Sequence, residues 1–266
     1  MTLPIVALHG WALNLRVFDT LFADLDSAMD RGMIDRRALS RFDLPGHGRA
    51  PEPLALQREA WPIELVAETL LAQMPARCIL IGWSLGATLA LQIAAQAPSR
   101  VAALVLVSAT PRFARAVDWP HGSDPTVLEG FVAHLAKDYR RTVAEFLELQ
   151  VRGSVAAEET LAALRAALAA QGESTAAVLQ RAVALLHATD LRAALPHISA
   201  PTLVITGRYD RIVHPHASRA LAALLPNARC IKFERCGHAP FLSHRNEFDA
   251  ALRSFLANLD ATEAAA

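Results

Sequence analysis

The amino-acid sequence predicts an α/β protein with a doubly wound, mostly parallel sheet of about six strands and an inserted block of helices. Two observations lead to this fold class. Short apolar runs alternate with helical patterns at both ends of the chain, which is typical of a parallel sheet. The runs are continuously apolar rather than alternating, as expected of strands that helices cover on both faces.

The strand-like runs fall into two groups. Four lie in the first part of the chain and two near its end: residues 3–8, 36–42, 77–81, 102–107, 201–206 and 228–233. Helical patterns follow three of these runs, at residues 85–97, 216–225 and 247–259. A chain of 266 residues buries roughly three quarters of its unfolded surface, so it needs no disulfide or metal to hold it together.

The middle of the chain shows helical patterns only. Four of them, rich in Ala, Leu and Arg, occur at residues 126–138, 142–152, 158–171 and 174–187, with breaks at Gly153 and Gly172. We expect residues 112–195 to form a helical lid between a first core part, 1–111, and a second core part, 196–266. Lid helices gate the entry of substrate and exclude water. The alternative is a helical subdomain that only adds stability, but an insertion after a strand's carboxyl end favours the lid.

Composition and charge exclude several classes of partner. Lys plus Arg and Asp plus Glu both number 26, so the chain lacks the positive excess that nucleic-acid binding needs. The mean hydropathy is +0.26, yet no apolar run reaches the roughly 18 to 20 residues of a membrane-spanning helix. Residues 1–8 lack the charged start of a signal peptide, and the three cysteines lack metal-ligand spacing. We therefore expect a cytoplasmic enzyme with no nucleic acid, membrane or metal partner.

The strongest local signal is Gly82-Trp83-Ser84-Leu85-Gly86, which follows one strand-like run and opens a helical pattern. This is the strand–turn–helix context that a G-x-S-x-G nucleophile elbow requires. Glycines are needed because the turn is strained and side chains on either flank would crowd the neighbouring backbone. The turn holds the Ser84 hydroxyl at a helix N-terminus, whose dipole favours developing negative charge. We predict Ser84 as a nucleophile; a glycine-flanked turn without chemistry is the alternative.

A serine nucleophile needs a base and an acid, in the chain order serine, acid, histidine. Asp210 and His238 stand in this order, each just past a strand-like run. We predict that His238 takes the Ser84 proton and returns it to the leaving alcohol. Asp210 then holds the imidazole in the right tautomer and stabilises its cation. Asp190, nearer the end of the predicted lid, is the alternative acid.

The oxyanion hole of such a site uses the backbone N–H after the nucleophile and one from the loop after the first strand. The two predicted donors are therefore Leu85 and Trp11. His9 lies close to Trp11, and we expect it to brace that loop by hydrogen bonds rather than to act in catalysis.

Three other features have a structural interpretation. The turn 43–49 is rich in glycine but lacks the lysine and the spacing of a phosphate-binding loop. His214 and His216 have no third ligand nearby, which favours a solvated loop over a metal pair. Cys236, close to His238, is expected to be a small buried residue.

Together these motifs resemble the α/β-hydrolase superfamily. The motifs concerned are residues 9–11, 43–49 and 82–86, Asp210, and Gly237-His238. More narrowly, the chain resembles the pimeloyl-[acyl-carrier protein] methyl ester esterases, the BioH family of carboxylesterases. This narrower resemblance rests on residues 118–120, 138–143, 146–150, 189–192 and 237–244, and it covers nearly the whole chain.

The resemblance implies a serine carboxylesterase that hydrolyses the methyl ester at the far end of a pimeloyl chain on acyl-carrier protein. This reaction belongs to the synthesis of the biotin precursor and uses no cofactor. The substrate pocket is expected between Ser84 and the lid. The family's contact positions fall on these residues: Trp11, Trp83, Ser84, Leu85, Phe146, Leu147, Gln150 and His238.

The resemblance also implies that the acidic carrier protein contacts the lid, where Arg141 matches one of the family's arginines. Glu145, Glu158 and Ala162 occupy other positions at which the family has basic residues. A second departure lies at the start of the chain. The family has a short hairpin before its first His-Gly-Trp strand, so the sheet is expected to be one or two strands shorter at one edge.

Two other functions stay open on the sequence alone. A general short-chain carboxylesterase or a lactonase would use the same three residues on small-molecule esters. A hydrolase-fold protein that binds a ligand without turnover is the second alternative, although such proteins often lose one member of the triad. In each case we expect a monomer.

Overall fold

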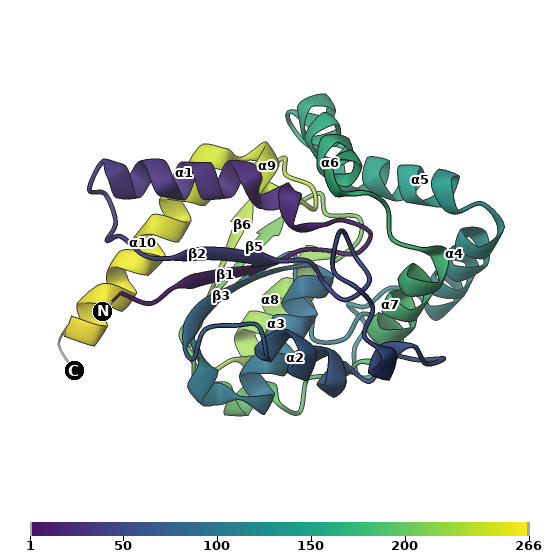
Figure 1. Ribbon diagram of the computed structural model, residues 1–266, viewed down its shortest axis with the longest axis horizontal. Coiled ribbons are helices and arrows are strands. Elements are labelled where there is room, and N and C mark those ends of the chain that lie inside the picture. Colours follow the sequence, from purple (N-terminus) through teal and green to yellow (C-terminus); the bar gives the residue numbers. More distant parts are fainter. Residues whose placement is uncertain (1, 265–266) are drawn as a thin grey trace.

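The computed structural model describes residues 2–264, and within them six parallel strands form one sheet in the order β2-β1-β3-β4-β5-β6 (Figure 1). The strands are β1 (Ile5–Leu8), β2 (Leu39–Phe42), β3 (Cys78–Trp83), β4 (Val101–Val107), β5 (Thr202–Gly207) and β6 (Ala228–Phe233). Each pair of neighbours is parallel. The predicted doubly wound sheet is confirmed, and each predicted strand overlaps an observed one.

Helices cover both faces of this sheet (Figure 1). On one face lie α1 (Asp19–Asp30), α9 (Pro240–Ser243) and α10 (Arg245–Ala264), and on the other α2 (Ile63–Leu71), α3 (Leu85–Gln96) and α8 (Pro215–Leu224). Helix α3 is buried at ten of its twelve positions, because it packs against β3 and is covered by α2. A helix that is apolar on all sides belongs in such a place. None of the described helices is both long and apolar enough to cross a membrane.

Four helices lie between β4 and β5 in the chain, where the sequence predicts the lid. They are α4 (Pro125–Lys137), α5 (Tyr139–Val151), α6 (Ala157–Gln171) and α7 (Ala176–Ala188), and they gather beyond the carboxyl ends of the strands (Figure 1). Helix α5 begins earlier than predicted because the Asp138 side chain caps it, accepting from the Arg141 N–H at 3.1 Å. Gly153 and Gly172 have φ of 81° and 88° and interrupt the helices as predicted. We call residues 112–195 the lid segment.

The lid segment is attached to the core by apolar packing, by backbone bonds such as that from the Val155 N–H to the carbonyl of Arg235 at 2.9 Å, and by side-chain links. Trp11 Nε1 donates to the carbonyl of Leu179 at 2.9 Å, and Asn14 Nδ2 donates to the carbonyl of Ala167 at 2.8 Å. Arg181 on α7 makes two bonds, of 2.9 and 2.7 Å, to the Glu52 carboxylate of the core. These links hold the helices over the end of the sheet.

The topology of the sheet decides where a site can form. Strands β1 and β3 are neighbours inside the sheet and are buried from end to end. The chain leaves β1 toward β2 at one edge and then returns to β3 on the other side, so the winding direction reverses between β1 and β3. Ligands of open α/β sheets bind beyond the carboxyl ends of the strands at such a reversal. The loop after β1 and the turn after β3 meet there.

Candidate active site

The turn between β3 and α3 carries Ser84 in a strained conformation. Its φ is 55° and its ψ is −115°, a region that residues other than glycine seldom adopt. A Cβ on Gly82 would lie 2.5 Å from the carbonyl oxygen of Gly86, and a Cβ on Gly86 would overlap the carbonyl oxygen of Leu8. Both glycines are therefore required, because the elbow packs directly against its own helix and against β1.

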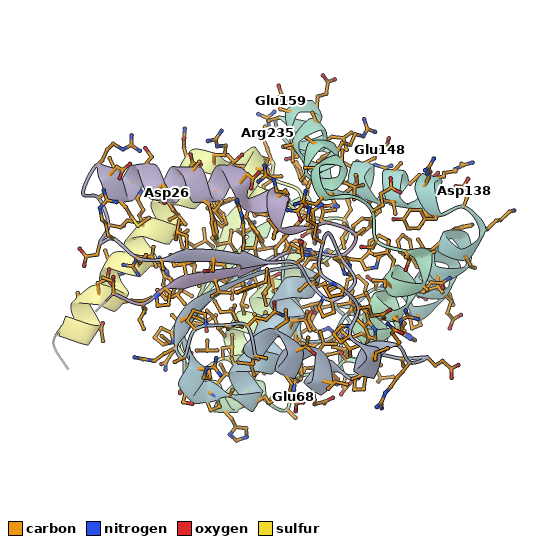
Figure 2. The ribbon with its side chains drawn as sticks, viewed as in Figure 1. Asp26, Glu68, Asp138, Glu148, Glu159 and Arg235 are labelled. Carbon is orange, nitrogen blue, oxygen red and sulfur yellow. The ribbon has the colours of Figure 1, made fainter. Side chains whose placement is uncertain are left out.

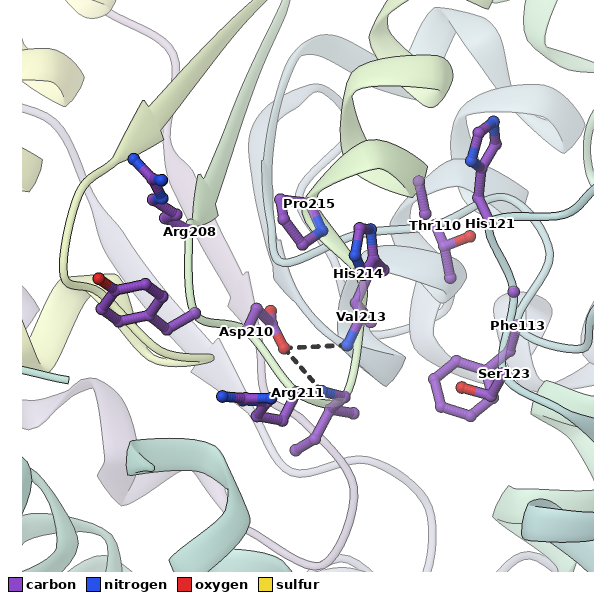
Figure 3. Close-up of a pocket in the computed structure, with 14 residues that line it drawn as sticks. Thr110, Phe113, His121, Ser123, Arg208, Asp210, Arg211, Val213, His214 and Pro215 are labelled. Carbon is purple, nitrogen blue, oxygen red and sulfur yellow. Dashed lines mark hydrogen bonds between the residues drawn. The ribbon is translucent and has the colours of Figure 1, made fainter. Parts of the chain in front are cut away.

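His238 and Asp210 come together from the ends of two neighbouring strands, β6 and β5. His238 Nδ1 donates to Asp210 Oδ2 at 2.8 Å, and both side chains are buried. Asp210 Oδ1 accepts from the backbone N–H groups of Ile212 and Val213, at 2.9 Å each (Figure 3). Since the carboxylate can only accept, the shared proton sits on Nδ1 and Nε2 is left as a base. His238 Nε2 is buried and has no hydrogen-bond partner among the described residues.

The backbone of His238 is fixed by three further bonds. Its N–H donates to the carbonyl of Gln150 at 2.8 Å. Its carbonyl accepts from Trp83 Nε1 at 2.8 Å and from Ser108 Oγ at 2.9 Å. Trp83 stands next to Ser84 in the elbow, so the strand end that presents the serine also positions the histidine. The sequence analysis missed Ser108, which follows β4 and lies in no recognisable motif.

The loop after β1 runs beside the serine. A Cβ on Gly10 would lie 3.4 Å from the Ser84 Cβ, and Trp11 is the next residue. The backbone N–H groups of Trp11 and Leu85 have no hydrogen-bond acceptor among the described residues. Two free donors next to a serine are what an oxyanion hole requires.

His9 braces this loop, as the sequence predicts. Its Nε2 accepts from the Leu44 N–H at 3.0 Å, which leaves Nδ1 to donate to the carbonyl of Gly10 at 2.8 Å. Burial lowers the pKa of His9 to about 4, so the ring is neutral at pH 7. The turn 43–49 is structural too: the Asp43 carboxylate accepts from the N–H groups of Leu15 and Arg49, at 2.7 and 3.0 Å.

An apolar cavity of about 120 Å³ opens onto Ser84. The Trp11 ring forms its wall together with Phe131 and Phe146, with ring centroids 5.1 and 4.8 Å away in edge-on geometry. The other residues that line it are Phe113, Ser123, Val127, Leu149, Val183, Leu186, Arg211 and Ile212. Most of this lining comes from the lid segment, so the lid and the core together form the cavity.

Comparison with known proteins agrees with this geometry. Residues 4–245 match the model of the alpha/beta hydrolase fold family. The chain belongs to this family.

It is 42% identical over 255 residues to the pimeloyl-[acyl-carrier protein] methyl ester esterase of Stenotrophomonas maltophilia (strain K279a), covering 96% of this chain and 93% of the relative. The enzyme of the same name from Nitrosomonas europaea is 40% identical over 244 residues, 92% of each chain. The chain is thus a member of the group that these esterases form within the hydrolase fold.

Solved structures of other hydrolases share the fold. The esterase EaEST from Exiguobacterium antarcticum has a TM-score of 0.80 and 21% identity, covering 96% of this chain and 92% of its own. The enol-lactonase from Burkholderia xenovorans LB400 has a TM-score of 0.77 and 20% identity, covering 97% and 92%. At this level of identity the likeness concerns the fold alone.

Three of the eight residues predicted as substrate contacts line the apolar cavity of this hydrolase. Trp11, Ser84 and Phe146 line the apolar cavity, but these five do not: Trp83, Leu85, Leu147, Gln150 and His238. The Trp83 ring packs on Phe241 with 5.1 Å between centroids, and its Nε1–H donates to the carbonyl of His238. The lining residues Phe113, Phe131 and Ile212 were missed, since helical periodicity does not tell which apolar side chains face a cavity.

Gln150 contributes its backbone to the site. Its carbonyl accepts from His238, and its side chain is 1% exposed. Both side-chain polar atoms lack hydrogen-bond partners among the described residues. Buried amides almost always form hydrogen bonds, so the unpaired side-chain amide of Gln150 lowers the stability of the folded protein.

Other candidates are excluded from catalysis by their surroundings. Asp190 bonds Arg112 and Arg192 at 2.7 Å each, which holds the pKa of its carboxyl well below its usual range. Asp210, and not Asp190, is the partner of His238. Burial raises the pKa of the Cys236 thiol to about 12, so it is no thiolate nucleophile. The described part of the chain has no cluster of three or more metal-ligating side chains, at His214 and His216 or elsewhere.

Proposed function

We propose that this hydrolase is a serine carboxylesterase that removes the methyl ester from a pimeloyl chain carried on acyl-carrier protein. Ser84 is the nucleophile, His238 the base and Asp210 the acid that orients it. One observation carries the mechanism: His238 Nε2 is buried without a partner, while Nδ1 is committed to Asp210. The identity of 42% to an esterase of this name supports the choice of ester.

In the first half of the reaction Ser84 Oγ attacks the ester carbonyl carbon as His238 Nε2 takes its proton. The carbonyl oxygen becomes an oxyanion that accepts hydrogen bonds from the N–H groups of Trp11 and Leu85. Each such donor contributes about 3 kcal/mol of transition-state stabilisation in serine hydrolases. The protonated His238 then donates to the methoxy oxygen, methanol leaves, and the acyl group remains on Ser84.

In the second half a water molecule attacks the acyl-enzyme. His238 Nε2 removes its proton, the same oxyanion hole holds the second tetrahedral intermediate, and Ser84 leaves with the proton from His238. The products are a free carboxylate and the regenerated enzyme. Asp210 stabilises the imidazolium in both halves without taking up the proton itself.

The lid segment supplies the acyl-binding surface. We propose that residues 112–195 act as a lid on the core parts 1–111 and 196–266. Phe131, Phe146 and Val183 from this segment line the apolar cavity at Ser84. A polymethylene chain buried there gains roughly 0.8 kcal/mol for each CH₂ removed from water. Closed helices over the ester also keep bulk water away from the acyl-enzyme.

The test is methanol release from pimeloyl-carrier methyl ester by the purified protein and by Ser84→Ala. We expect release by the wild type and a loss on the order of 10⁵-fold or more in the variant. Circular dichroism checks that Ser84→Ala stays folded. A folded wild type that leaves this ester intact contradicts the proposal. Growth of a biotin auxotroph that lacks the esterase, rescued only with Ser84 intact, tests the pathway and its cytoplasmic setting.

A general short-chain esterase or lactonase is the second candidate. The size of the cavity, about 120 Å³, favours it because this volume suits a short acyl group. High activity on p-nitrophenyl butyrate together with no activity on the carrier ester would favour the short-chain esterase or lactonase. Labelling of Ser84 by a fluorophosphonate separates both enzymes from a binding protein without turnover, which would stay unlabelled.

A further inference from the structure

The outer lid helices α5 and α6 do not form a basic face. Residues 139–171, which span both helices and the link between them, carry four arginines and four glutamates, a net charge of 4 − 4 = 0: Arg140, Arg141, Arg152, Arg165, Glu145, Glu148, Glu158 and Glu159. Arg141, the predicted carrier contact, pairs with Glu145 at 2.8 Å, and Arg165 pairs with Glu148 at 3.1 Å. Figure 2 shows Glu148 and Glu159 on the outer side of these helices. An acidic partner gains little from such a surface.

The basic side chains gather instead on the segment from β5 to β6. Residues 202–233 hold five basic residues and one acidic residue, a net charge of 5 − 1 = +4: Arg208, Arg211, Arg219, Arg229, Lys232 and Asp210. We call Arg208, Arg211, Arg219 and Lys232 the basic face, because they line two adjoining hollows of about 410 and 320 Å³. The hollows share Arg208, His214 and Pro215, and Figure 3 shows these three among the residues that line the larger hollow.

The charge of the basic face is largely unbalanced. Arg211 and Arg219 form no ion pair with any described residue, and both are exposed. Arg208 and Lys232 share one carboxylate, that of Glu234, at 2.7 and 3.0 Å. Among the described residues, the only acidic side chain that lines either hollow is Asp210, which is buried and bonded to His238. Counting Glu234, the face keeps a charge of 4 − 1 = +3.

The basic face is continuous with the catalytic cavity. Phe113, Ser123, Arg211 and Ile212 line both the cavity at Ser84 and the larger hollow. An acyl chain whose ester lies at Ser84 therefore has a route past Arg211 to the basic face. The apolar part of that route is on the Ser84 side, and its cationic part is at the surface.

We propose that a carrier protein with an acidic surface docks on the basic face, and not on the outer side of α5 and α6, while its ester chain enters past Arg211. The identity of the partner rests on the proposed function. Complementary charge raises association rates by roughly 10- to 1,000-fold and makes them depend on salt. The zero net charge of the chain hides this uneven distribution.

Two charge-matched double variants test the docking surface. Arg219→Glu with Lys232→Glu reverses the basic face at positions away from the Ser84 cavity, and Arg141→Glu with Arg165→Glu reverses the lid. For the first pair we expect kcat/KM on the carrier ester to fall roughly 10- to 100-fold at low ionic strength. Activity of the same variant on p-nitrophenyl butyrate should stay within about twofold. The lid pair should lose less than about threefold on either substrate.

Salt gives a second readout. The wild-type kcat/KM on the carrier ester should fall toward that of the basic-face variant at about 1 M salt, where the Debye length is about 3 Å. A larger loss in the lid pair than in the basic-face pair would overturn the proposal in favour of the lid. Equal losses of kcat/KM in both double variants would mean that net charge, and not a particular surface, is the cause. No loss in either double variant would exclude electrostatic docking. Each of these outcomes overturns the proposal.

A binding measurement separates this proposal from the proposed function. Titration of the carrier protein with Ser84→Ala, and with Ser84→Ala combined with the basic-face pair, measures docking without turnover. A wild type that fails on the carrier ester defeats the proposed function. Docking stands if Ser84→Ala binds the carrier roughly tenfold or more tightly than the combined variant, and falls if the two bind alike.

Discussion

The carboxyl end of the sheet holds its functional groups mainly through the backbone, whereas the lid segment contributes mainly side-chain surface. Ser84 lies in a turn that two glycines make sterically feasible, and His238 has three backbone bonds besides its bond to Asp210. The lid segment offers Phe131 and Phe146 as walls of the cavity. Its backbone takes part at one place beside the site, where the carbonyl of Gln150 accepts from the His238 N–H.

This difference separates two tasks. Atoms that take part in bond making need positions defined to a fraction of an ångström, and strands and tight turns provide such positions. Acyl chains are recognised by shape and apolar area, which many sets of side chains supply equally well. Changes at the sheet end should therefore affect the rate of the chemical steps, while changes in the lid should affect binding and selectivity.

After the loss of Ser84 itself, the largest expected effect comes from Asp210→Asn. The asparagine can donate to His238, which favours the wrong tautomer and leaves Nε2 unable to accept the Ser84 proton. In a serine protease the corresponding exchange lowers kcat about 10⁴-fold, and we expect a similar loss on p-nitrophenyl butyrate. Asp190→Asn is the matched control and should change kcat by less than about twofold. A tenfold or smaller loss in Asp210→Asn would remove Asp210 from the triad.

The Ser84 turn and the pairing of His238 with Asp210, the basis of the proposed triad, were predictable because their signals are local. A G-x-S-x-G turn after an apolar run identifies Ser84, and the chain order with positions after strands identifies Asp210 and His238. The strands of the sheet were predictable for the same reason. Their buried apolar runs leave a continuous pattern in the sequence.

The cavity lining was less predictable because it depends on which side of each element faces inward after packing. The bond from Trp83 Nε1 to the carbonyl of His238, for example, joins residues that no local pattern relates. Ile212 and Arg211 follow Asp210 closely, yet only the folded loop directs them to the cavity. The basic face combines residues up to 24 positions apart (232 − 208), and no local pattern marks them as neighbours.

Acid should destabilise the loops at the sheet end. Burial lowers the pKa of His9 to about 4 and of His47 to about 3, from 6.5 in the unfolded chain. Between pH 6.5 and the lowered pKa values, the two histidines bind protons in the unfolded chain but stay neutral in the folded protein. The free energy of unfolding therefore falls as pH falls. At pH 5 each histidine should cost about 2 kcal/mol relative to pH 8.

Urea unfolding at pH 8 and pH 5 measures this loss. His47→Asn keeps a donor for the carbonyl of Pro45, which His47 Nδ1 contacts at 3.0 Å, but it does not titrate. The pH-dependent loss should shrink by about 2 kcal/mol in this variant. An unchanged loss would show that His47 is protonated alike in the folded and unfolded states.

A smaller effect is expected in the lid wall. Phe146→Ala removes a ring that borders the cavity and touches Trp11. Full burial of such a side chain is worth roughly 1.5–3 kcal/mol, and Phe146 is partly buried, so KM for long acyl esters should rise up to about tenfold. For p-nitrophenyl acetate kcat should change by less than about threefold. A large loss of kcat on acetate would mean that the lid also positions the catalytic groups, and the division of tasks would fail.

The smallest effect should come from the link between the lid and the core. Glu52 accepts two bonds from Arg181, and Trp61 Nε1 donates to the same carboxylate at 3.0 Å. Glu52→Gln keeps the shape but removes the charge, which should cost about 1 kcal/mol because the pair is only partly exposed. Hydrogen exchange in α7 should then rise up to about fivefold, while exchange in α3 stays unchanged. Equal increases in both helices would mean that the lid and the sheet open together as one cooperative unit, and that the lid does not move independently over a fixed catalytic core.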